Sequence, residues 1–340
     1  MKSGEIINNK RAGLIIQPGA VGDVILTLPL VRLLKRQLGL VRVDMMGHSE
    51  PLELLIGRSE VDRSIPIETI ELHRLFEDNA TFDLPEGDSL IELFRPYEII
   101  LTFLNDPQGH FEQNLLYTAV MTHAAEVIEL KLTPPARFGG HAAHYYLRQF
   151  VEQFIPARKQ DWDEYSAGLI HPQQAEIETG RKLLTEKGLD LRRPKVLIHP
   201  GSGSERKCWP LKNFQRLAAL SAQQGLQVIF LVGPVEQERW GMEAIRELNA
   251  QVPVLQGLTL TEVAGLLKCC DGYVGNDSGI SHLAGVLGGA TAAVFGVSQA
   301  RHWKPMGQKV TVCQEKGKGK NRWPSVEKVL SDLIDLINDK

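Results

Sequence analysis

The sequence predicts an α/β protein made of two doubly wound units, each a parallel sheet wrapped by helices. Its 340 residues exceed the roughly 100 to 200 residues of an ordinary domain. Short apolar runs alternate with stretches of helical spacing, the pattern of a parallel sheet with crossover helices. That alternation is interrupted at 188–194, where a glycine, charged residues and Pro194 precede a new strand. We therefore expect an N-terminal domain over 1–190 and a second domain over 191–324.

In the first domain, apolar runs predict strands at 14–17, 41–46, 99–104 and 126–130. Helical spacing predicts helices at 24–38, 51–57, 68–77, 111–120, 142–154 and 173–186.

The second domain repeats the scheme, with strands expected at 195–199, 228–232, 252–255, 272–274 and 291–295. Helices are expected at 211–224, 236–248, 260–267 and 280–287. Ser325 is a good N-cap for a last amphipathic helix, so we treat 325–340 as a C-terminal helix that could pack back on the first domain. Two doubly wound units would face a ligand cleft with their strand ends and helix starts.

Composition places the chain among ordinary globular proteins, with 43% apolar and 23% charged residues. It has no long apolar run, and its first residues lack the apolar core of a secretory signal, so we expect a cytoplasmic protein. The four cysteines lack metal-binding spacing, and no nucleic-acid recognition motif occurs. Basic residues outnumber acidic ones only after residue 190, which suits an anionic ligand in the second half.

The segment Gly275-Asn276-Asp277-Ser278-Gly279 follows an apolar strand and precedes a helical run. Glycines let a backbone approach a ligand closely, and free N–H groups at a helix start receive phosphate. The alternative is that Asp277 or Ser278 only caps the helix, worth about 1 kcal/mol.

A second strand-to-helix turn, His199 to Pro210, contains small residues that can form an anion-binding nest. Lys207 in this turn supplies a compact positive charge, which suits neutralisation of a leaving diphosphate. The alternative is a solvated surface lysine.

A third turn, Gly19-Ala20-Val21-Gly22-Asp23, closes the first strand. It is neither a Walker A loop nor a full GxGxxG motif. In a dinucleotide site the ribose-binding acid stands at the end of the next strand, whereas Asp44 lies inside the apolar run 41–46. Asp23 is a candidate base or simply an N-cap. Two acidic candidates are weaker. Asp161-Trp162-Asp163 is interpreted as a solvated loop. Glu236 or Glu238 could accept hydrogen bonds from ribose hydroxyls, or could simply place a favourable negative charge at a helix start.

Four motifs in this order resemble the ADP-heptose:lipopolysaccharide heptosyltransferase family, glycosyltransferase family 9. They are Gly22-Asp23, Ala136-Arg137-Phe138-Gly139, Lys207-Cys208-Trp209-Pro210, and Asn276-Asp277-Ser278-Gly279 followed by His282-Leu283-Ala284. The resemblance spans nearly the whole chain and implies a GT-B fold, with acceptor bound by the first domain and donor by the second. One departure is Gly296-Val297-Ser298, where the family often has Gly-Pro-Thr or Gly-Pro-Ser, so the donor sugar can differ.

By resemblance, Asp23 and Lys207 are the catalytic residues, Asp23 as general base and Lys207 facing the donor phosphates. The resemblance also implies donor contacts from Ser202, Glu236, Leu258, Asp277, Ser278, Gly279 and His282, with Glu238 an alternative to Glu236. Arg137 and His141 are expected to contact the acceptor.

The resemblance implies an inverting, metal-independent transfer of heptose or a related sugar from an ADP-sugar to a lipopolysaccharide core acceptor, without a cofactor. The expected partners are thus a nucleotide sugar, an anionic glycolipid and, transiently, the inner face of the inner membrane, where a basic run from Lys316 to Arg322 could assist. The alternatives are a GT-B enzyme that uses another nucleotide sugar and a catalytically silent nucleotide-sugar-binding protein.

Overall fold

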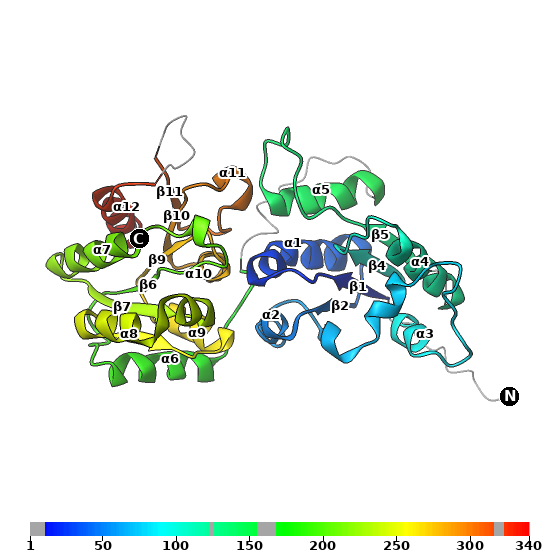
Figure 1. The fold of residues 1–340 in the computed structure, drawn as a ribbon, viewed down its shortest axis with the longest axis horizontal. Helices are drawn as coiled ribbons and strands as arrows, with labels where there is room; N and C mark the ends of the chain where they lie inside the picture. Colours follow the sequence, from blue (N-terminus) through cyan, green and yellow to red (C-terminus); the bar gives the residue numbers. More distant parts are fainter. Residues whose placement is uncertain (1–10, 123–124, 155–167, 316–322, 340) are drawn as a thin grey trace. The chain divides into compact units, whose positions relative to one another are not determined.

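A computed structural model describes residues 11–122, 125–154, 168–315 and 323–339 (Figure 1). The chain forms two compact units. The first comprises residues 1–19, 27–133 and 146–159, and the second comprises 20–26, 134–145 and 160–340. The acidic pair around Trp162 and the basic run from Lys316 lie outside the described residues.

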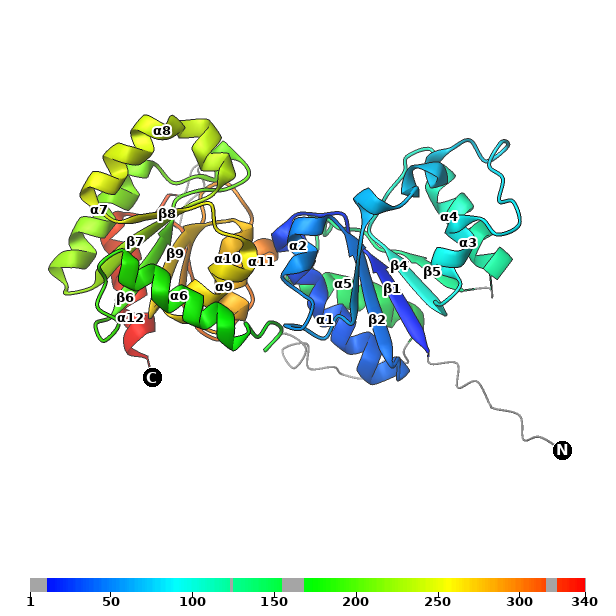
Figure 2. The same ribbon diagram turned by 90° about the horizontal axis from the view of Figure 1, so that it is seen from below.

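The first unit contains a five-stranded parallel sheet in the order β3-β2-β1-β4-β5. Figure 2 shows β1 at its centre, flanked by β2 and β4. All five residues of β1 are buried, as expected for a central strand of a parallel sheet. The strands are β1 (Ala12–Ile16), β2 (Arg42–Gly47), β3 (Arg63–Pro66), β4 (Ile99–Thr102) and β5 (Glu126–Glu129).

Helices α3 and α4 and the short helix η2 cover an apolar core on this first sheet, centred on Leu14, Ile16, Ile100, Phe94 and Phe111. Helix α1 begins directly after β1, so its first turn stands at the carboxyl end of the central strand. The helices are α1 (Val21–Leu38), α2 (Ser49–Glu53), η1 (Ile67–Thr69), η2 (Leu72–Phe76), α3 (Ser89–Phe94), α4 (His110–Thr122) and α5 (Ala142–Phe154).

The second unit contains a six-stranded parallel sheet in the order β11-β10-β9-β6-β7-β8. Strand order reverses between β6 and β9, and ligands of doubly wound sheets bind at such a reversal. The strands are β6 (Lys195–His199), β7 (Gln227–Val232), β8 (Val254–Gln256), β9 (Gly272–Asn276), β10 (Ala290–Val294) and β11 (Val310–Cys313).

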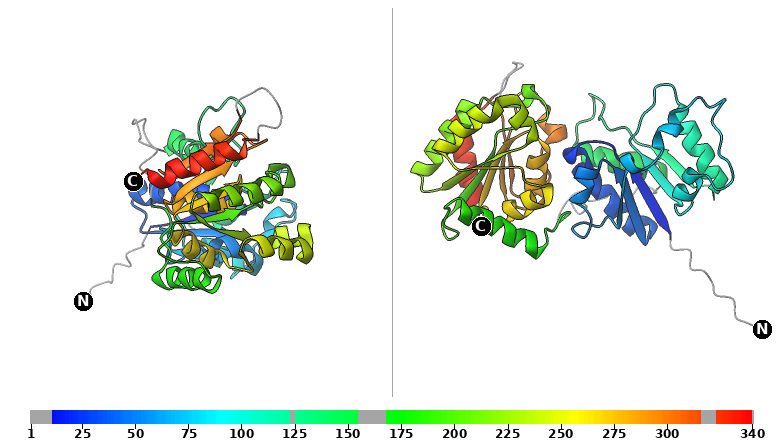
Figure 3. Two further views of the ribbon diagram at one scale, coloured as in Figure 1. Left: turned by 90° about the vertical axis from the view of Figure 1, so that its left-hand side faces the viewer. Right: turned by 60° about the horizontal axis from the view of Figure 1, so that its bottom comes forward.

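Helices α7, α8 and α12 share one apolar core on this second sheet, and Figure 3 shows α12 lying beside α7. Helix α9 connects β8 to β9 and helix α10 connects β9 to β10, so the chain crosses the sheet in the opposite direction to that taken by α7 and α8. With right-handed crossovers, α9 and α10 therefore cover the other face of the sheet. The helices are α6 (Gln174–Glu186), η4 (Glu205–Lys207), α7 (Leu211–Gln223), α8 (Pro234–Gln251), α9 (Leu260–Lys268), α10 (Gly279–Val286), α11 (Ala300–Trp303) and α12 (Val326–Asn338).

These two parallel sheets confirm the predicted α/β fold class, and several details differ from the expectation. Strands β3 and β11 and helices α3 and α11 were not predicted. Helix α6 packs closely on α9 and groups with the second unit, although residue 190 was the expected boundary. Helix α12 buries Val329 and Leu333 in the second core. Its packing on the first domain stays a prediction.

Candidate active site

The end of β9 and the start of α10 form the turn that the sequence singled out. Ser278 is the N-cap of α10 and accepts a hydrogen bond from the Ser281 N–H through its hydroxyl, at 3.4 Å. A side chain at Gly279 would overlap Val21, because a Cβ there would lie 2.7 Å from the Val21 Cβ. Only glycine therefore lets the helix start pass this close to the first turn of α1.

Asn276, which the sequence reasoning left without a role, holds the neighbouring loop in place. Its buried amide nitrogen donates to the carbonyls of Pro200 at 2.7 Å and Gly201 at 3.2 Å, and its oxygen accepts from the Trp209 N–H at 2.8 Å. The hydroxyl of Ser202 adds a bond of 2.8 Å to the Asp277 carbonyl. The two strand-to-helix turns of the second unit are thus tied together at both ends of the loop.

Lys207 and Asp277 face each other from these two turns. The Lys207 Nζ lies 2.9 Å from the Asp277 Oδ2, as an ion pair whose angles fall outside those of a hydrogen bond. The carboxylate is 6% exposed and the lysine side chain 40%, so the ammonium still reaches solvent. This position leaves the ammonium able to meet an incoming anion.

Asp23 stands in the first turn of α1, half-buried, and one of its oxygens accepts from the Ala20 N–H at 3.2 Å. Burial raises the pKa of Asp23 above its ordinary value; the Ala20 bond and the charge of Lys207 oppose this, and the charge of Asp277 adds to it. A carboxylate with a raised pKa holds a proton more strongly and is the better base.

His282 lies on the buried side of α10, and its Nδ1 has no hydrogen-bond partner among the described residues. Burial lowers the pKa of His282 to about 4, so its imidazole is neutral at neutral pH. An unpaired buried nitrogen is costly and suits a polar group of a ligand.

One pocket of the second unit, with a volume of about 280 Å³, is lined by Asp23, Lys207, Asp277, His282 and the start of α10. This is near the lower limit of small-molecule sites, roughly 300 Å³. The lining comprises Ala20, Gly22, Asp23, Leu26, Ser202, Gly203, Ser204, Lys207, Asp277, Ser278, Gly279, His282 and Trp303. The structure therefore brings together both predicted catalytic residues and most of the predicted donor residues.

Glu236 and Leu258 do not line this pocket. Glu236 is buried and accepts from the Gly233 N–H at 2.9 Å, which caps α8, whereas Glu238 is exposed. Leu258 is partly buried in the loop between β8 and α9. Their expected contacts with ribose and base stay predictions.

The two predicted acceptor residues differ in environment. Arg137 is exposed, whereas His141 is buried and donates from Nε2 to the Lys304 carbonyl at 2.7 Å. Burial lowers the pKa of His141 to about 4. The Nε2 of His141 is therefore already engaged, and the acceptor roles of both residues stay predictions.

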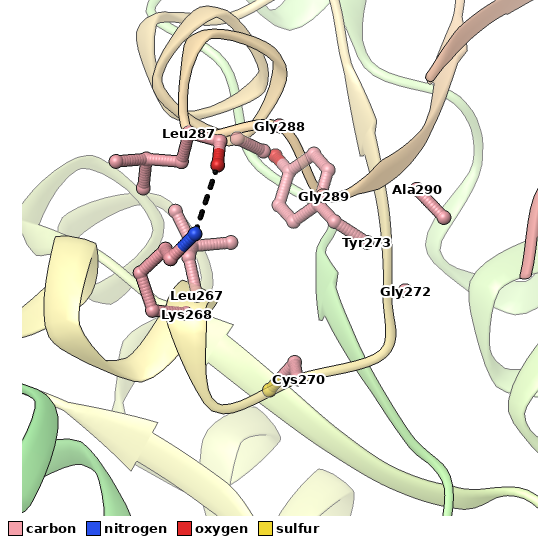
Figure 4. A pocket seen from close by; sticks show the side chains of 10 residues that line it. Leu267, Lys268, Cys270, Gly272, Tyr273, Leu287, Gly288, Gly289 and Ala290 are labelled. Atoms are coloured by element: carbon pink, nitrogen blue, oxygen red, sulfur yellow. Dashed lines mark hydrogen bonds between the residues drawn. The ribbon is translucent and has the colours of Figure 1, made fainter. Parts of the chain in front are cut away.

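A second, smaller cavity of about 80 Å³ lies at the opposite ends of β9 and β10 (Figure 4). Lys268 donates there to the Leu287 carbonyl at 3.2 Å. Lys268, Cys270 and Tyr273 are among the residues that line this cavity, and the lining contains no carboxylate.

Across the described ranges, no three His, Cys, Asp or Glu side chains gather as a metal-ion site would require. Within the same ranges, none of the helices has the length and apolar character needed to cross a membrane.

Known proteins resemble this chain along most of its length. Lipopolysaccharide heptosyltransferase 2 of Salmonella typhimurium is 26% identical over 319 residues, covering 88% of this chain and 86% of that protein. Lipooligosaccharide heptosyltransferase 2 of Haemophilus influenzae is 25% identical over 306 residues, covering 88% and 87%.

Solved structures share the fold at lower identity. A glycosyl transferase family 9 structure from Veillonella parvula has a TM-score of 0.72 at 18% identity, covering 97% of this chain and 98% of that one. The ADP-heptose lps heptosyltransferase II of E. coli has a TM-score of 0.70 at 21% identity, covering 96% and 98%. The fold is therefore that of the GT-B heptosyltransferases.

The sequence profile of glycosyltransferase family 9 (heptosyltransferase) matches residues 141–329, which is more than half of the chain and includes every strand of the second sheet. The chain is a glycosyltransferase and belongs to glycosyltransferase family 9, the heptosyltransferase family.

Proposed function

We propose that this enzyme transfers heptose from ADP-heptose to a sugar of the lipopolysaccharide core. The observation that carries the proposal is the single pocket in which a carboxylate with a raised pKa, Asp23, lies with Lys207 and the start of α10. The similarity to lipopolysaccharide heptosyltransferases supports the substrate class.

In the proposed reaction, Asp23 removes the proton of an acceptor hydroxyl as the hydroxyl oxygen attacks the anomeric carbon. The bond between that carbon and the diphosphate breaks on the opposite side, so the configuration inverts in one displacement. The leaving diphosphate takes the bonding electrons and departs with two partners: the Lys207 ammonium and the N–H groups at the start of α10. Stabilising developing charge with such fixed donors is commonly the largest single contribution to catalysis.

The electrostatics of the pocket support these roles. The ion pair with Asp277 holds the charge of Lys207 beside the phosphate-suited turn at the start of α10. The helix start adds partial positive charge to the same place. His282, neutral at neutral pH, can donate to or accept from a sugar hydroxyl without adding charge.

The test is transfer by the purified full-length chain, with ADP-heptose and, separately, UDP- and GDP-sugars as donors. A deacylated lipopolysaccharide core oligosaccharide serves as acceptor, and release of the nucleotide is measured. We expect acceptor-dependent release of ADP alone. Release of UDP or GDP at comparable rates would assign another donor, and binding without turnover would indicate a silent relative.

The roles of the two catalytic residues are tested in the same assay. Asp23→Asn should lower kcat by about 10²- to 10⁴-fold, the usual contribution of a placed base. Lys207→Ala should also lower kcat, by about 10²-fold or more. The exposed residues Asp335 and Lys212 supply matched controls, Asp335→Asn and Lys212→Ala, which should leave kcat unchanged.

A further inference from the structure

The lining of the pocket in the second unit combines two kinds of residue. Ser202, Lys207 and Ser278 belong to the phosphate-suited turns. The same lining contains the apolar residues Leu26 and Trp303, together with the carboxylate of Asp23. Trp303 is the aromatic member of this lining, and the sequence reasoning gave it no role.

The backbone around Trp303 is held on both sides. The N–H groups of His302 and Trp303 donate to the Gln299 carbonyl at 2.9 and 3.2 Å. The next residue, Lys304, accepts the hydrogen bond of His141 through its carbonyl at 2.7 Å. A side chain mounted on backbone fixed in this way is presented to the pocket in a defined orientation.

The exposure of Trp303 separates a ligand platform from a core filler. Trp209 of the same unit is 1% exposed and packs edge-on against Phe214, with ring centroids 5.0 Å apart. Trp303 is only partly buried, and it is one of the residues that line the pocket. A tryptophan that only filled the core would have no reason to be partly exposed at a site for polar ligands.

We propose that the indole of Trp303 is a stacking platform for a pyranose ring, which it holds where Asp23 can reach a hydroxyl. This rests on the proposed function and adds a specificity-determining residue to it. The face of an aromatic ring carries partial negative charge and attracts the weakly positive C–H groups on one face of a sugar, while both surfaces leave water. A sugar stacked on Trp303 would lie in the same pocket as Asp23 and Lys207.

The ring that stacks belongs either to the donor heptose or to the acceptor, and the experiment distinguishes the two. Trp303→Ala and Trp303→Phe are compared with the unaltered full-length enzyme in KM for ADP-heptose and KM for the core oligosaccharide. We expect Trp303→Ala to raise one of these KM values about ten-fold or more, as loss of a stacked ring does elsewhere, with a smaller change in kcat. Trp303→Phe keeps an aromatic face and should stay within about three-fold.

Tryptophan emission gives a second readout that needs no turnover. ADP-heptose or the core oligosaccharide, whichever carries the stacked ring, should change the emission of the unaltered enzyme, and ADP alone should not. Trp303→Phe should abolish this response. Trp240→Phe is the control that should retain it, since Trp240 packs against the core formed under α7, α8 and α12.

The inference is overturned if both KM values stay within about two-fold in Trp303→Ala, a change below the stacking range, or if Trp303→Phe keeps the emission response. If Trp303→Ala does not fold, the Phe variant and the emission measurements decide alone. Failure of the proposed function looks different: the unaltered enzyme would transfer nothing from ADP-heptose, whereas normal transfer by Trp303→Ala would remove the stacking role only.

Discussion

Replacing Asn276 with alanine should destabilise the second unit strongly, because one buried amide supports the whole loop from Pro200 to Trp209. The change removes three hydrogen bonds of 2.7, 3.2 and 2.8 Å. It leaves two carbonyls and one N–H without partners in a region where Asn276 is 0% exposed. An orphaned buried polar group costs about 1 to 3 kcal/mol, and water entering the space left behind recovers part of this. We therefore expect a loss of about 4 kcal/mol.

The assay is urea unfolding of the full-length chain, followed by circular dichroism and by tryptophan emission. With a slope of about 2 kcal/mol per molar urea, the midpoint of the second unit should fall by about 2 M. Asn249→Ala is the matched control, since that exposed side chain makes a single bond, 2.9 Å from its oxygen to the Val254 nitrogen, worth about 1 kcal/mol. A loss from Asn276→Ala no larger than that of the control would refute the reasoning.

Three further predictions concern packing and charge in the same unit. Gly180→Ala should cost about 2 kcal/mol or more in urea unfolding, because the new Cβ would lie 2.8 Å from the backbone of Gly265; a neutral result would mean that α6 can shift. Gly279→Ala should raise the KM for the donor, because the new Cβ would displace the phosphate-suited turn from Val21, and this effect should exceed its effect on the free energy of unfolding. The same donor KM in Gly279→Ala and the unaltered enzyme would contradict this. Because burial lowers the pKa of His141 to about 4, the unfolded chain takes up a proton at higher pH than the folded protein does. The stability that neutral His141 contributes should therefore be complete above pH 6.5 and be lost as the pH falls towards about 4. His141→Gln should remove this pH dependence, which amounts to roughly 3 kcal/mol between urea unfolding curves measured at pH 7 and at pH 4.

The central strands could be predicted from the sequence and two edge strands could not. Strand β1 is an uninterrupted buried run, whereas β3 is partly exposed and ends in Pro66, and β11 has a single fully buried residue. Edge strands are covered on fewer sides, so their residues carry less of the apolar signal on which the prediction depends. The predicted helix at 68–77 is replaced by two short 3₁₀ segments, η1 over Ile67–Thr69 and η2 over Leu72–Phe76.

The site shows the same division between local and long-range information. The phosphate-suited turns could be recognised because a strand end, small residues and a helix start follow one another directly in the chain. The structural role of Asn276 could not be predicted from the sequence, because its hydrogen-bond partners lie 67 to 76 residues away in the chain. Trp303 likewise reaches the pocket through a four-residue helix that has no periodic pattern of its own.

The charges around Asp23 predict how donor binding would change its pKa. The positive charge of Lys207 lowers the pKa of Asp23, and the negative charge of Asp277 raises it. In the proposed donor complex, a diphosphate would neutralise Lys207 and bring negative charge of its own. Both changes favour the protonated carboxyl, so the pKa of Asp23 would rise further when the donor is bound. The base would then be strongest in the complex in which a proton must be removed, and the acid limb of the kcat profile should lie at higher pH than that of kcat/KM.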